Sequence, residues 1–121
     1  MILEKLPCDL TVCKTASIDE IDLHAGILFN GRTDSEISLV CPTSDVPKGV
    51  TDREDGWRGF RVRGPLDFSL TGVLAGLSGI LSDHGIPIFA VSTFDTDYIL
   101  VKAGDLDRAS GALKRAGHEI R

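Results

Sequence analysis

The chain has 121 residues, 42% of them hydrophobic and 26% charged, and 18 acidic against 13 basic side chains give it a net charge of −5. This composition argues against a fibre, a disordered tail and a membrane protein, because no apolar run approaches the roughly 20 residues that cross a bilayer. The negative charge argues against a nucleic-acid partner, since affinity for phosphate backbones comes from clustered Lys and Arg.

The first half of the chain, residues 1–51, predicts strands and almost no helix. Three segments alternate as strands do, and the last two would form a hairpin: residues 10–16, 27–30 and 36–41. Residues 17–20 and 46–51 remain for helices of one turn each. The charged, Gly-ended stretch 52–56 then predicts an exposed connection to the second half.

The second half opens with a predicted strand and a helix. Residues 57–63 alternate as a strand, which Pro65 ends because proline cannot continue a ladder inside a sheet. Ser69 is a suitable N-cap and Gly85 a suitable left-handed C-terminal residue for a helix of about 14 residues. Its apolar residues recur at helical spacing: Leu70, Val73, Leu74, Leu77, Ile80 and Leu81.

Two strands joined by a turn follow this helix. The apolar run 87–92 suits a strand buried on both faces, or on one face and at an interface. Residues 93–97 have turn chemistry, because Asp side chains can bond nearby backbone amides, and residues 98–102 are the returning strand.

A second helix and a short strand complete the chain. Asp105 is its predicted cap and Gly117 its stop signal, and four of its residues are expected to face inward: Leu106, Ala109, Leu113 and Ala116. Residues 119–121 suffice for a last strand. The second half therefore has the order βαββαβ, and the first half looks like a βαββ order with its helices nearly deleted.

The three cysteines, Cys8, Cys13 and Cys41, are an odd number, which argues against a disulfide framework. Reduced thiols, and a start without the long apolar segment of a signal peptide, predict a cytoplasmic protein. Cys8 and Cys13 have no histidine at ligand spacing, so we expect small buried hydrophobic residues and no metal site.

Basic residues lie close together only at Arg58, Arg61 and Arg63. They alternate with apolar residues along the strand expected at 57–63. Alternating charges on one face of a strand are typical of a solvated surface, which is the interpretation adopted for this group.

No motif of the chain predicts catalysis. The three histidines, His24, His84 and His118, fall in loops or at helix ends, and there is no Gly-x-Ser-x-Gly, His-Glu-x-x-His or phosphate loop. Cys41 has no recognisable base nearby. We therefore expect neither an enzyme nor a cofactor.

Two motifs of the second half together resemble a known family. The first lies at residues 57–72 and ends in Gly-Pro-Leu-Asp-Phe-Ser-Leu-Thr-Gly, and the second, at 88–101, is Ile-Phe-Ala-Val-Ser-Thr-Phe-Asp-Thr-Asp-Tyr-Ile-Leu-Val. They resemble ACT domains of the aspartate-kinase type, and more closely the small tandem-ACT proteins similar to the cytosolic arginine sensors of animals. The resemblance implies an α+β fold of tandem ACT-like (ferredoxin-like βαββαβ) units, with antiparallel sheets and helices on one face. A degenerate unit, reduced in helix, would occupy 1–51 and a complete ACT domain 57–121.

The resemblance also implies a regulatory protein without catalytic activity that binds a free amino acid at an interface between ACT units. In the related sensors the site uses the loop entering the long helix and the end of the following strand. The ligand-binding residues carried over in this way are Asp67, Phe68, Ser69, Leu70, Thr71, Gly72, Thr93, Phe94, Thr96 and Asp97. Asp95 is a weaker candidate because it serves the turn. With one complete and one reduced unit per chain, a site between complete units needs a second copy of the protein.

The chemistry of these residues agrees with the resemblance in part. An amino acid needs amides or a helix N-terminus for its carboxylate and carboxylates for its ammonium. The loop 66–70 leads into a helix N-terminus, and Asp95 and Asp97 are carboxylates. These aspartates favour a basic side chain only weakly, because every amino acid brings an ammonium.

Each site residue also has a purely structural interpretation. Ser69 would serve only as an N-cap, Asp97 would hold only its own turn, and Phe68 would belong to the core. The alternative function is correspondingly a ligand-free structural or protein-interaction module that modulates a partner enzyme.

A stripe of small residues lies on the predicted long helix, away from its leucines. Its members are Gly72, Ala75, Gly76 and Gly79. Helical glycines cost roughly 1 kcal/mol each relative to alanine, so a closely approaching surface should compensate. The stripe predicts a two-fold homodimer, and packing against the first half of the same chain is the alternative.

Overall fold

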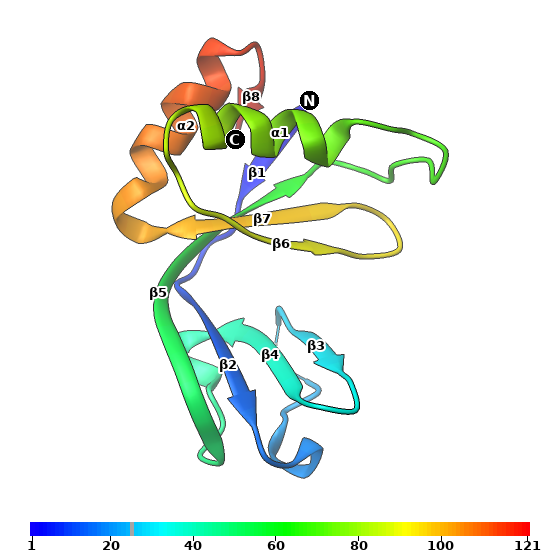
Figure 1. Ribbon diagram of the computed structural model, residues 1–121, viewed down its shortest axis with the longest axis vertical. Helices are drawn as coiled ribbons and strands as arrows, with labels where there is room; N and C mark the ends of the chain where they lie inside the picture. Colours follow the sequence, from blue (N-terminus) through cyan, green and yellow to red (C-terminus); the bar gives the residue numbers. More distant parts are fainter. Residues whose placement is uncertain (25) are drawn as a thin grey trace. The chain divides into compact units, whose positions relative to one another are not determined.

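The computed structural model describes residues 1–24 and 26–121, which form two compact units (Figure 1). One, called the helical unit below, combines Met1–Pro7 with Arg58–Arg121. The other, called the β unit, is Cys8–Trp57.

The strands of the helical unit form one mixed sheet in the order β6-β7-β5-β1-β8. Their bounds are β1 Ile2–Lys5, β5 Val50–Val62, β6 Phe89–Ser92, β7 Asp97–Lys102 and β8 Glu119–Ile120. β1 runs antiparallel to β5, with Leu3 opposite Val62, and parallel to β8, with Leu3 opposite Ile120. This parallel pair differs from the wholly antiparallel sheets that the sequence predicts.

The sequence also predicts a division of the chain between residues 51 and 57, with the first residues in the first half. Contacts instead join the first seven residues to the helical unit. The reason is β1, which lies between β5 and β8 and supplies the buried side chain of Leu3 to that unit. Along the rest of the unit, the elements follow the predicted βαββαβ order.

Two helices, α1 (Val73–Asp83) and α2 (Leu106–Arg115), cover one face of this sheet. Leu3, Phe60 and Val62 share a face of neighbouring strands, because Leu3 is opposite Val62 and strand side chains alternate. They pack in one core with residues of both helices and of β7: Leu77, Leu81, Ala109, Leu113, Ile99 and Val101. The opposite face of the sheet therefore has no helix of this unit over it.

The helix boundaries correct part of the prediction. α1 begins at Val73 rather than after Ser69, and its N-cap is Gly72, with a φ of 80° that favours glycine. Ser69 is therefore not the N-cap. The helix ends as expected, with Gly85 in the left-handed region at a φ of 68°. In α2, Ala112 is buried and Ala116 is exposed, so the expectation that Ala116 faces inward is wrong.

β6 is an edge strand rather than the strand buried on both faces that its apolar sequence favours. It pairs with β7 alone in the described part of the chain, with Phe89 opposite Leu100 and Ser92 opposite Asp97. Ala90 and Ser92 are exposed, while Phe89 and Val91 are half-buried. One face of the strand and its outer edge are thus open.

The β unit has the strand order β3-β4-β2-β5 and, among its described residues, no α-helix. Its own strands are β2 Leu10–Thr15, β3 Phe29–Arg32 and β4 Ile37–Pro42, and the first part of β5 completes the sheet. The predicted hairpin is confirmed, with Arg32 of β3 opposite Ile37 of β4. One-turn 3₁₀ helices occupy Ile18–Glu20, as predicted, and Thr43–Asp45.

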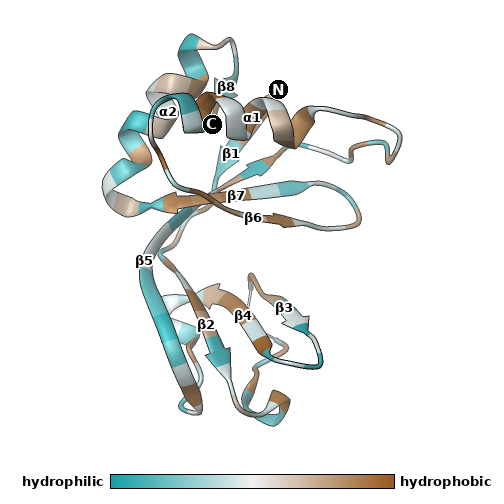
Figure 2. Ribbon diagram, in the orientation of Figure 1, coloured by the Kyte–Doolittle hydropathy of each residue, from teal (hydrophilic) through white to brown (hydrophobic). Residues whose placement is uncertain are grey.

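Two expectations for the end of the β unit are wrong. No helical turn forms at 46–51, because the turn falls earlier and β5 already begins at Val50. The stretch 52–56 is not a loop but part of β5, with Asp52 opposite Lys14 and Glu54 opposite Val12. Figure 2 shows this stretch as mainly hydrophilic, and residues 52–55 are exposed. The charges therefore mark a surface segment of a strand and not a connection.

The interior of the β unit is partly polar. One apolar cluster consists of Cys13, Ile21, Leu39 and Cys41, and Leu10, Val40 and Trp57 of this unit are also buried. Cys13 and Cys41 are buried and free, as predicted, whereas Cys8, which was also expected to be buried, is half-buried. Burial, followed by the neighbouring Cys13, raises the pKa of the Cys41 thiol to about 11.

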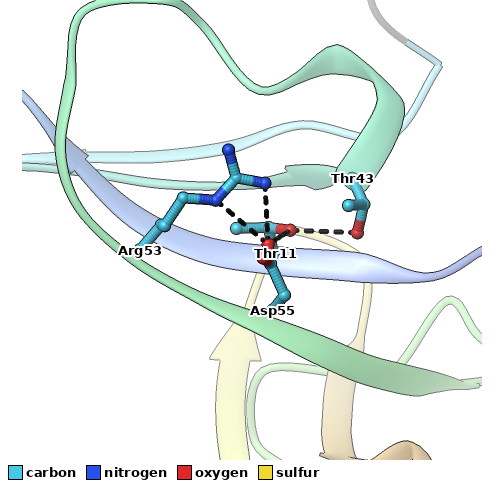
Figure 3. Close-up of polar contacts among 4 residues, drawn as sticks. All are labelled: Thr11, Thr43, Arg53 and Asp55. Atoms are coloured by element: carbon cyan, nitrogen blue, oxygen red, sulfur yellow. Dashed lines mark hydrogen bonds and ion pairs between the residues drawn. The ribbon is translucent and has the colours of Figure 1, made fainter.

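A polar cluster lies on β2 and β5 of the same unit (Figure 3). The buried Thr11 donates through Oγ1 to Asp55 Oδ1 at 2.6 Å, and the Thr43 hydroxyl lies 2.9 Å from Thr11 Oγ1. Arg53 Nη2 donates to the same Asp55 oxygen at 2.8 Å. The buried hydroxyl is therefore satisfied by hydrogen bonds, as a buried polar group requires.

Neither α1 nor α2, nor any other helix of the described residues, is long and apolar enough to cross a membrane.

Candidate functional site

Two loops of the helical unit meet over one cavity of about 360 Å³. One loop precedes α1 and the other joins β6 to β7. The cavity is lined by Leu66, Asp67, Phe68, Leu70, Gly72, Val73, Leu74, Ala75, Ser92, Thr93, Phe94, Asp95, Thr96 and Asp97. Segments about 20 residues apart in the sequence are brought together here because α1 and β6 run out and back between them.

The loop before α1 is built on Asp67. Its Oδ1 accepts hydrogen bonds from Ser69 N at 2.8 Å and Ser69 Oγ at 2.6 Å, and its carbonyl accepts one from Leu70 N at 3.0 Å. The bonds from Ser69, the hydroxyl first, hold the pKa of the Asp67 carboxyl below its usual value. Ser69 thus serves the loop, and Asp67 presents a charged carboxylate at the cavity.

The N-terminus of α1 opens onto the cavity without a side-chain cap. The N-cap Gly72 makes no side-chain bond, and its carbonyl accepts the first helical hydrogen bond from Gly76 N at 2.8 Å. The amides at the start of a helix have no acceptor within it and carry the positive end of the helix dipole. Val73, Leu74 and Ala75, which line the cavity, supply these amides.

The β6–β7 turn is held by its threonines. The amide and hydroxyl of Thr93 donate to Thr96 O at 2.8 and 3.0 Å, and the buried Thr96 donates through Oγ1 to Val62 O at 2.6 Å. At the strand end, Ser92 Oγ donates to Asp97 Oδ1 at 2.7 Å. The turn is therefore anchored to β5, and it does not depend on the side chain of Asp95.

The two loops are joined directly to each other. Leu66 N donates to Asp95 O at 2.6 Å, and a Cβ added at Gly64 would lie 3.0 Å from the same carbonyl. A side chain at Gly64 would therefore push the turn away from the loop before α1. The glycine permits the close approach that closes this side of the cavity.

Two aromatic rings join the loops at the surface. Phe68 and Phe94 make an edge-to-face contact, with their ring centroids 4.9 Å apart. Phe68 is 75% exposed and Phe94 79% exposed, and Leu70 beside them is also exposed. The core interpretation of Phe68 is therefore wrong.

Of the ten predicted ligand-binding residues, eight line this cavity, and Ser69 and Thr71 do not. Asp95, the weaker candidate, lines it as well. Sequence reasoning missed the apolar wall, Leu66 and Val73 to Ala75, and the polar Ser92. A hydroxyl that ends an apolar strand was a usable signal for Ser92. Among the wall residues, Val73 and Leu74 matched the apolar spacing of a helix core, and Ala75 was assigned to the small-residue stripe.

The charges at the cavity have one sign. Three carboxylates line it, those of Asp67, Asp95 and Asp97, and no Lys or Arg of the described residues does. The amides at the start of α1 are the positive group opposite them. The arrangement can hold an ammonium or guanidinium beside the aspartates and a carboxylate at the helix N-terminus. Among the described residues, no group of His, Cys, Asp and Glu is arranged to hold a metal ion.

Comparison with solved structures finds similar proteins over nearly the whole chain. Protein Atu0741 from Agobacterium tumefaciens is 34% identical, and the match covers 99% of this chain and 91% of that chain with a TM-score of 0.87. VC0802 from Vibrio cholerae, described as a possible transport protein, is 18% identical over 92% of this chain and 85% of that chain, with a TM-score of 0.71. No protein with a curated description matches the sequence.

The fold is also that of a regulatory subunit. The regulatory subunit of aspartate kinase from Thermus thermophilus, in its ligand-free form, is 8% identical over 95% of this chain and 96% of that chain, with a TM-score of 0.66. At this identity the likeness concerns the fold alone, which is α+β and tandem ACT-like as in that subunit. The model of the ACT domain matches residues 52–115, from the middle of β5 to the end of α2, and ACT domains typically bind small ligands such as amino acids. The chain therefore belongs to the ACT domain family.

Proposed function

We propose that this protein is an amino-acid sensor: a regulatory module without catalytic activity that binds a free amino acid in the cavity between the loop before α1 and the β6–β7 turn. The observation that supports it most is that aspartate carboxylates and the positive end of a helix dipole line one space. The uncapped N-terminus of α1 is available for the ligand carboxylate, and Asp97 and Asp95 are available for its ammonium or a basic side chain.

The exposed rings of Phe68 and Phe94 support a site that a second molecule completes. Large apolar side chains that are exposed beside an open cavity are typical of a surface that another molecule covers. In the proposal, a second copy of the chain covers this side, so that the amino acid lies between ACT units of a homodimer.

The glycine face of α1 supports the same dimer. Nothing lies within 4 Å of a Cβ added at Gly76 or Gly79, so no packing seen in the helical unit explains these glycines. Beside them is a second groove, lined by Ala75, Ser78, Gly79, Ser82, Gly85, Ile86, Pro87 and Ile88. The open edge of β6 adjoins it in sequence, and an unpaired edge strand is available for pairing with another chain.

Binding is tested by thermal unfolding in each of the twenty amino acids at millimolar concentration. A ligand at 100 times its Kd adds about 2.7 kcal/mol, which shifts the Tm by roughly 10 °C in a protein of this size. Asp97→Asn should abolish the shift, and Asp107→Asn, an exposed aspartate of α2, should keep it. An unchanged shift in Asp97→Asn would remove Asp97 from the site.

The dimer is tested by sedimentation equilibrium at tens of micromolar. The wild type should sediment as a dimer and Gly79→Leu as a folded monomer. α1 itself has room for a leucine side chain at this position, but a second copy that packs closely against the glycines does not. Gly104→Leu is the control, since a Cβ there also meets nothing within 4 Å. A monomeric wild type would overturn the homodimer.

The second candidate is a ligand-free interaction module that modulates a partner enzyme. The exposed apolar group of Phe68, Leu70 and Phe94 favours it, because such a group can dock on a protein as well as cover a ligand. The same thermal screen separates the two candidates. Stabilisation by none of the twenty amino acids would favour the interaction module.

A further inference from the structure

A second cavity lies on the face of the sheet opposite α1 and α2. Glu4 of β1 is opposite Arg61 of β5, and both point away from the core face that holds Leu3 and Val62. Arg63, two residues along the chain, points the same way as Arg61. Two of the three neighbouring arginines of the sequence therefore lie side by side over one carboxylate.

This cavity has a volume of about 310 Å³, similar to the smallest pockets that hold organic ligands. It is lined by Glu4, Arg61, Arg63, Gly64, Pro65, Thr93, Asp95, Thr96 and Tyr98. All these residues belong to the helical unit. Thr93, Asp95 and Thr96 also line the first cavity, so the β6–β7 turn forms a wall common to both.

The guanidinium groups here have hydrogen-bonding capacity to spare. Arg61 Nε lies 3.5 Å from Glu4 Oε1, and Arg63 Nη2 lies 3.4 Å from Glu4 Oε2. Charge-assisted hydrogen bonds normally measure about 2.7–2.9 Å, and each guanidinium has five N–H donors. One carboxylate at these distances does not use the donors of two arginines.

Arg61 is also held in place without a ligand. Its Cζ lies 6.0 Å from the centre of the Tyr98 ring, and a side-chain hydrogen bond to Tyr98 is the main cause that raises the pKa of Arg61. A guanidinium positioned by an aromatic ring loses less conformational freedom when an anion binds.

Asp95 adds a second acidic residue, after Glu4, to the lining of this cavity. Its carboxylate has no hydrogen bond or ion pair with any residue that the structure describes, and its backbone carbonyl alone joins the neighbouring loop. A hydroxyl or ammonium substituent on the ligand can therefore bond to Asp95 while an acid group bonds to the arginines.

From this geometry we propose that the second cavity binds the carboxylate of a small organic acid, with Arg61 and Arg63 as the anchoring residues. A planar carboxylate matches the fork of a guanidinium, which makes two parallel hydrogen bonds to it. This site shares Asp95 and the β6–β7 turn with the proposed amino-acid cavity, but its anchoring residues Arg61 and Arg63 line the second cavity alone. Arg61 and Arg63 are partly exposed, as a solvated face requires, and the proposal adds a ligand-binding role for them. Arg58 takes no part and donates to Leu6 O through Nη2 at 3.4 Å.

The test is an NMR titration of the ¹⁵N-labelled full chain with sodium propionate, sodium succinate and sodium phosphate, each against sodium chloride at equal ionic strength. The reporters are the Nε–H signals of Arg61 and Arg63 and the backbone amides of Gly64 and Tyr98. Saturable shifts with a carboxylate and not with chloride are expected. Arg63→Gln and Arg61→Gln should each weaken the affinity at least tenfold, and Arg115→Gln on α2 should not change it.

Folding of the variants is checked by their Tm, which should stay within about 3 °C of the wild type because exposed ion pairs contribute little. The Asp97→Asn variant distinguishes the two cavities. Its Kd for propionate should stay within about twofold of the wild-type value, whether or not the variant still binds amino acids. Chemical-shift changes that increase linearly with carboxylate concentration and match those caused by chloride would overturn the proposal. So would carboxylate affinity that is unchanged in both arginine variants, or saturable binding of inorganic phosphate without binding of either carboxylate.

Discussion

The two units of this chain stabilise their sheets in different ways. In the helical unit, α1 and α2 cover one face, and large aliphatic side chains from both helices and the strands fill the core. In the β unit, short 3₁₀ turns take the place of helices, two of the core residues are cysteines, and the buried Thr11 forms hydrogen bonds to side chains. A sheet without helices over it has less apolar surface to bury, so small residues and satisfied polar groups contribute more of its stability.

The two units also differ in the candidate binding cavities that they form. Both proposed ligand cavities are lined by residues of the helical unit, the first where two loops meet at the start of α1 and the second on the opposite face of the sheet. A rigid, well-packed core beneath these loops is what a binding site needs, because ligand groups are held only as accurately as the elements that present them.

The largest expected effect compares the two cores. Leu81→Ala in α1 should lower the free energy of unfolding by about 3–5 kcal/mol, and Leu39→Ala in β4 by about 2–3 kcal/mol, since both side chains are buried but the first leaves a cavity in the larger core. Urea denaturation followed by hydrogen exchange of each unit measures both. Equal losses of unfolding free energy in the two variants, or a larger loss in Leu39→Ala, would contradict this comparison of the two cores.

The polar cluster of the β unit gives the next effect. Thr11→Val leaves Asp55 and Thr43 without their buried partner and should cost about 1–3 kcal/mol of unfolding free energy. Thr51→Val, whose exposed hydroxyl makes a long 3.4 Å bond to Lys14 O, is the control and should stay within about 0.5 kcal/mol. Similar values for the two variants would show that the cluster adds nothing to the stability of the β unit.

The buried thiol should make stability fall at high pH. Burial raises the pKa of Cys41 to about 11 in the folded protein, above the value of 9.0 for a free thiol. As the pH rises from 9 towards 11, the unfolded chain loses this proton first, so the free energy of unfolding decreases over that window. Cys41→Ala should flatten this dependence relative to the wild type when chemical denaturation is repeated at several pH values. If Cys41→Ala leaves the slope of unfolding free energy against pH unchanged, the pH dependence comes from other titrating groups.

The smallest effect concerns the loop before α1. Ser69→Ala removes the hydroxyl bond that contributes most to lowering the pKa of Asp67, so that pKa should rise towards its usual value. This contact stabilises the folded protein at pH values above the usual pKa of an aspartate, and the stabilisation is lost as the pH falls. The contribution is small because Asp67 is exposed. NMR titration of the Asp67 carboxyl measures the shift. An unchanged pKa would show that the Ser69 amide alone sets it.

The elements that the sequence predicts well are those with strong local signals. The helices at 73–83 and 106–115 follow apolar spacing and end near glycines that adopt left-handed conformations, and the hairpin of β3 and β4 surrounds its turn residues. The elements it misses depend on distant partners. β1 is a short strand whose pairing with β5 and β8 involves residues more than 50 positions away, and nothing local marks it.

The site divides in the same way. The resemblance selects the two loops, and the structure brings eight of the ten selected residues to one cavity. Ser69 was assigned to the helix because its sequence position suits an N-cap, but its bond to Asp67 competes with that role and Gly72 caps α1 instead. The apolar wall was missed because its helical residues fit patterns of core packing and of the small-residue stripe. The second cavity was missed because it combines Glu4 with residues more than 50 positions away in the sequence.

By itself, the sequence determines the order of the strands and helices in the second half and the burial of Cys13 and Cys41, and the family resemblance selects the two loops of the candidate site. These follow from local propensity, spacing and turn chemistry, which act within a few residues. Only the tertiary structure decides that the first seven residues join the helical unit, that 52–56 continue β5, and that Arg61 and Arg63 meet Glu4 at a second cavity. Those outcomes depend on strand pairing between distant segments, and the free energy of pairing depends on partners that no local window of the sequence contains.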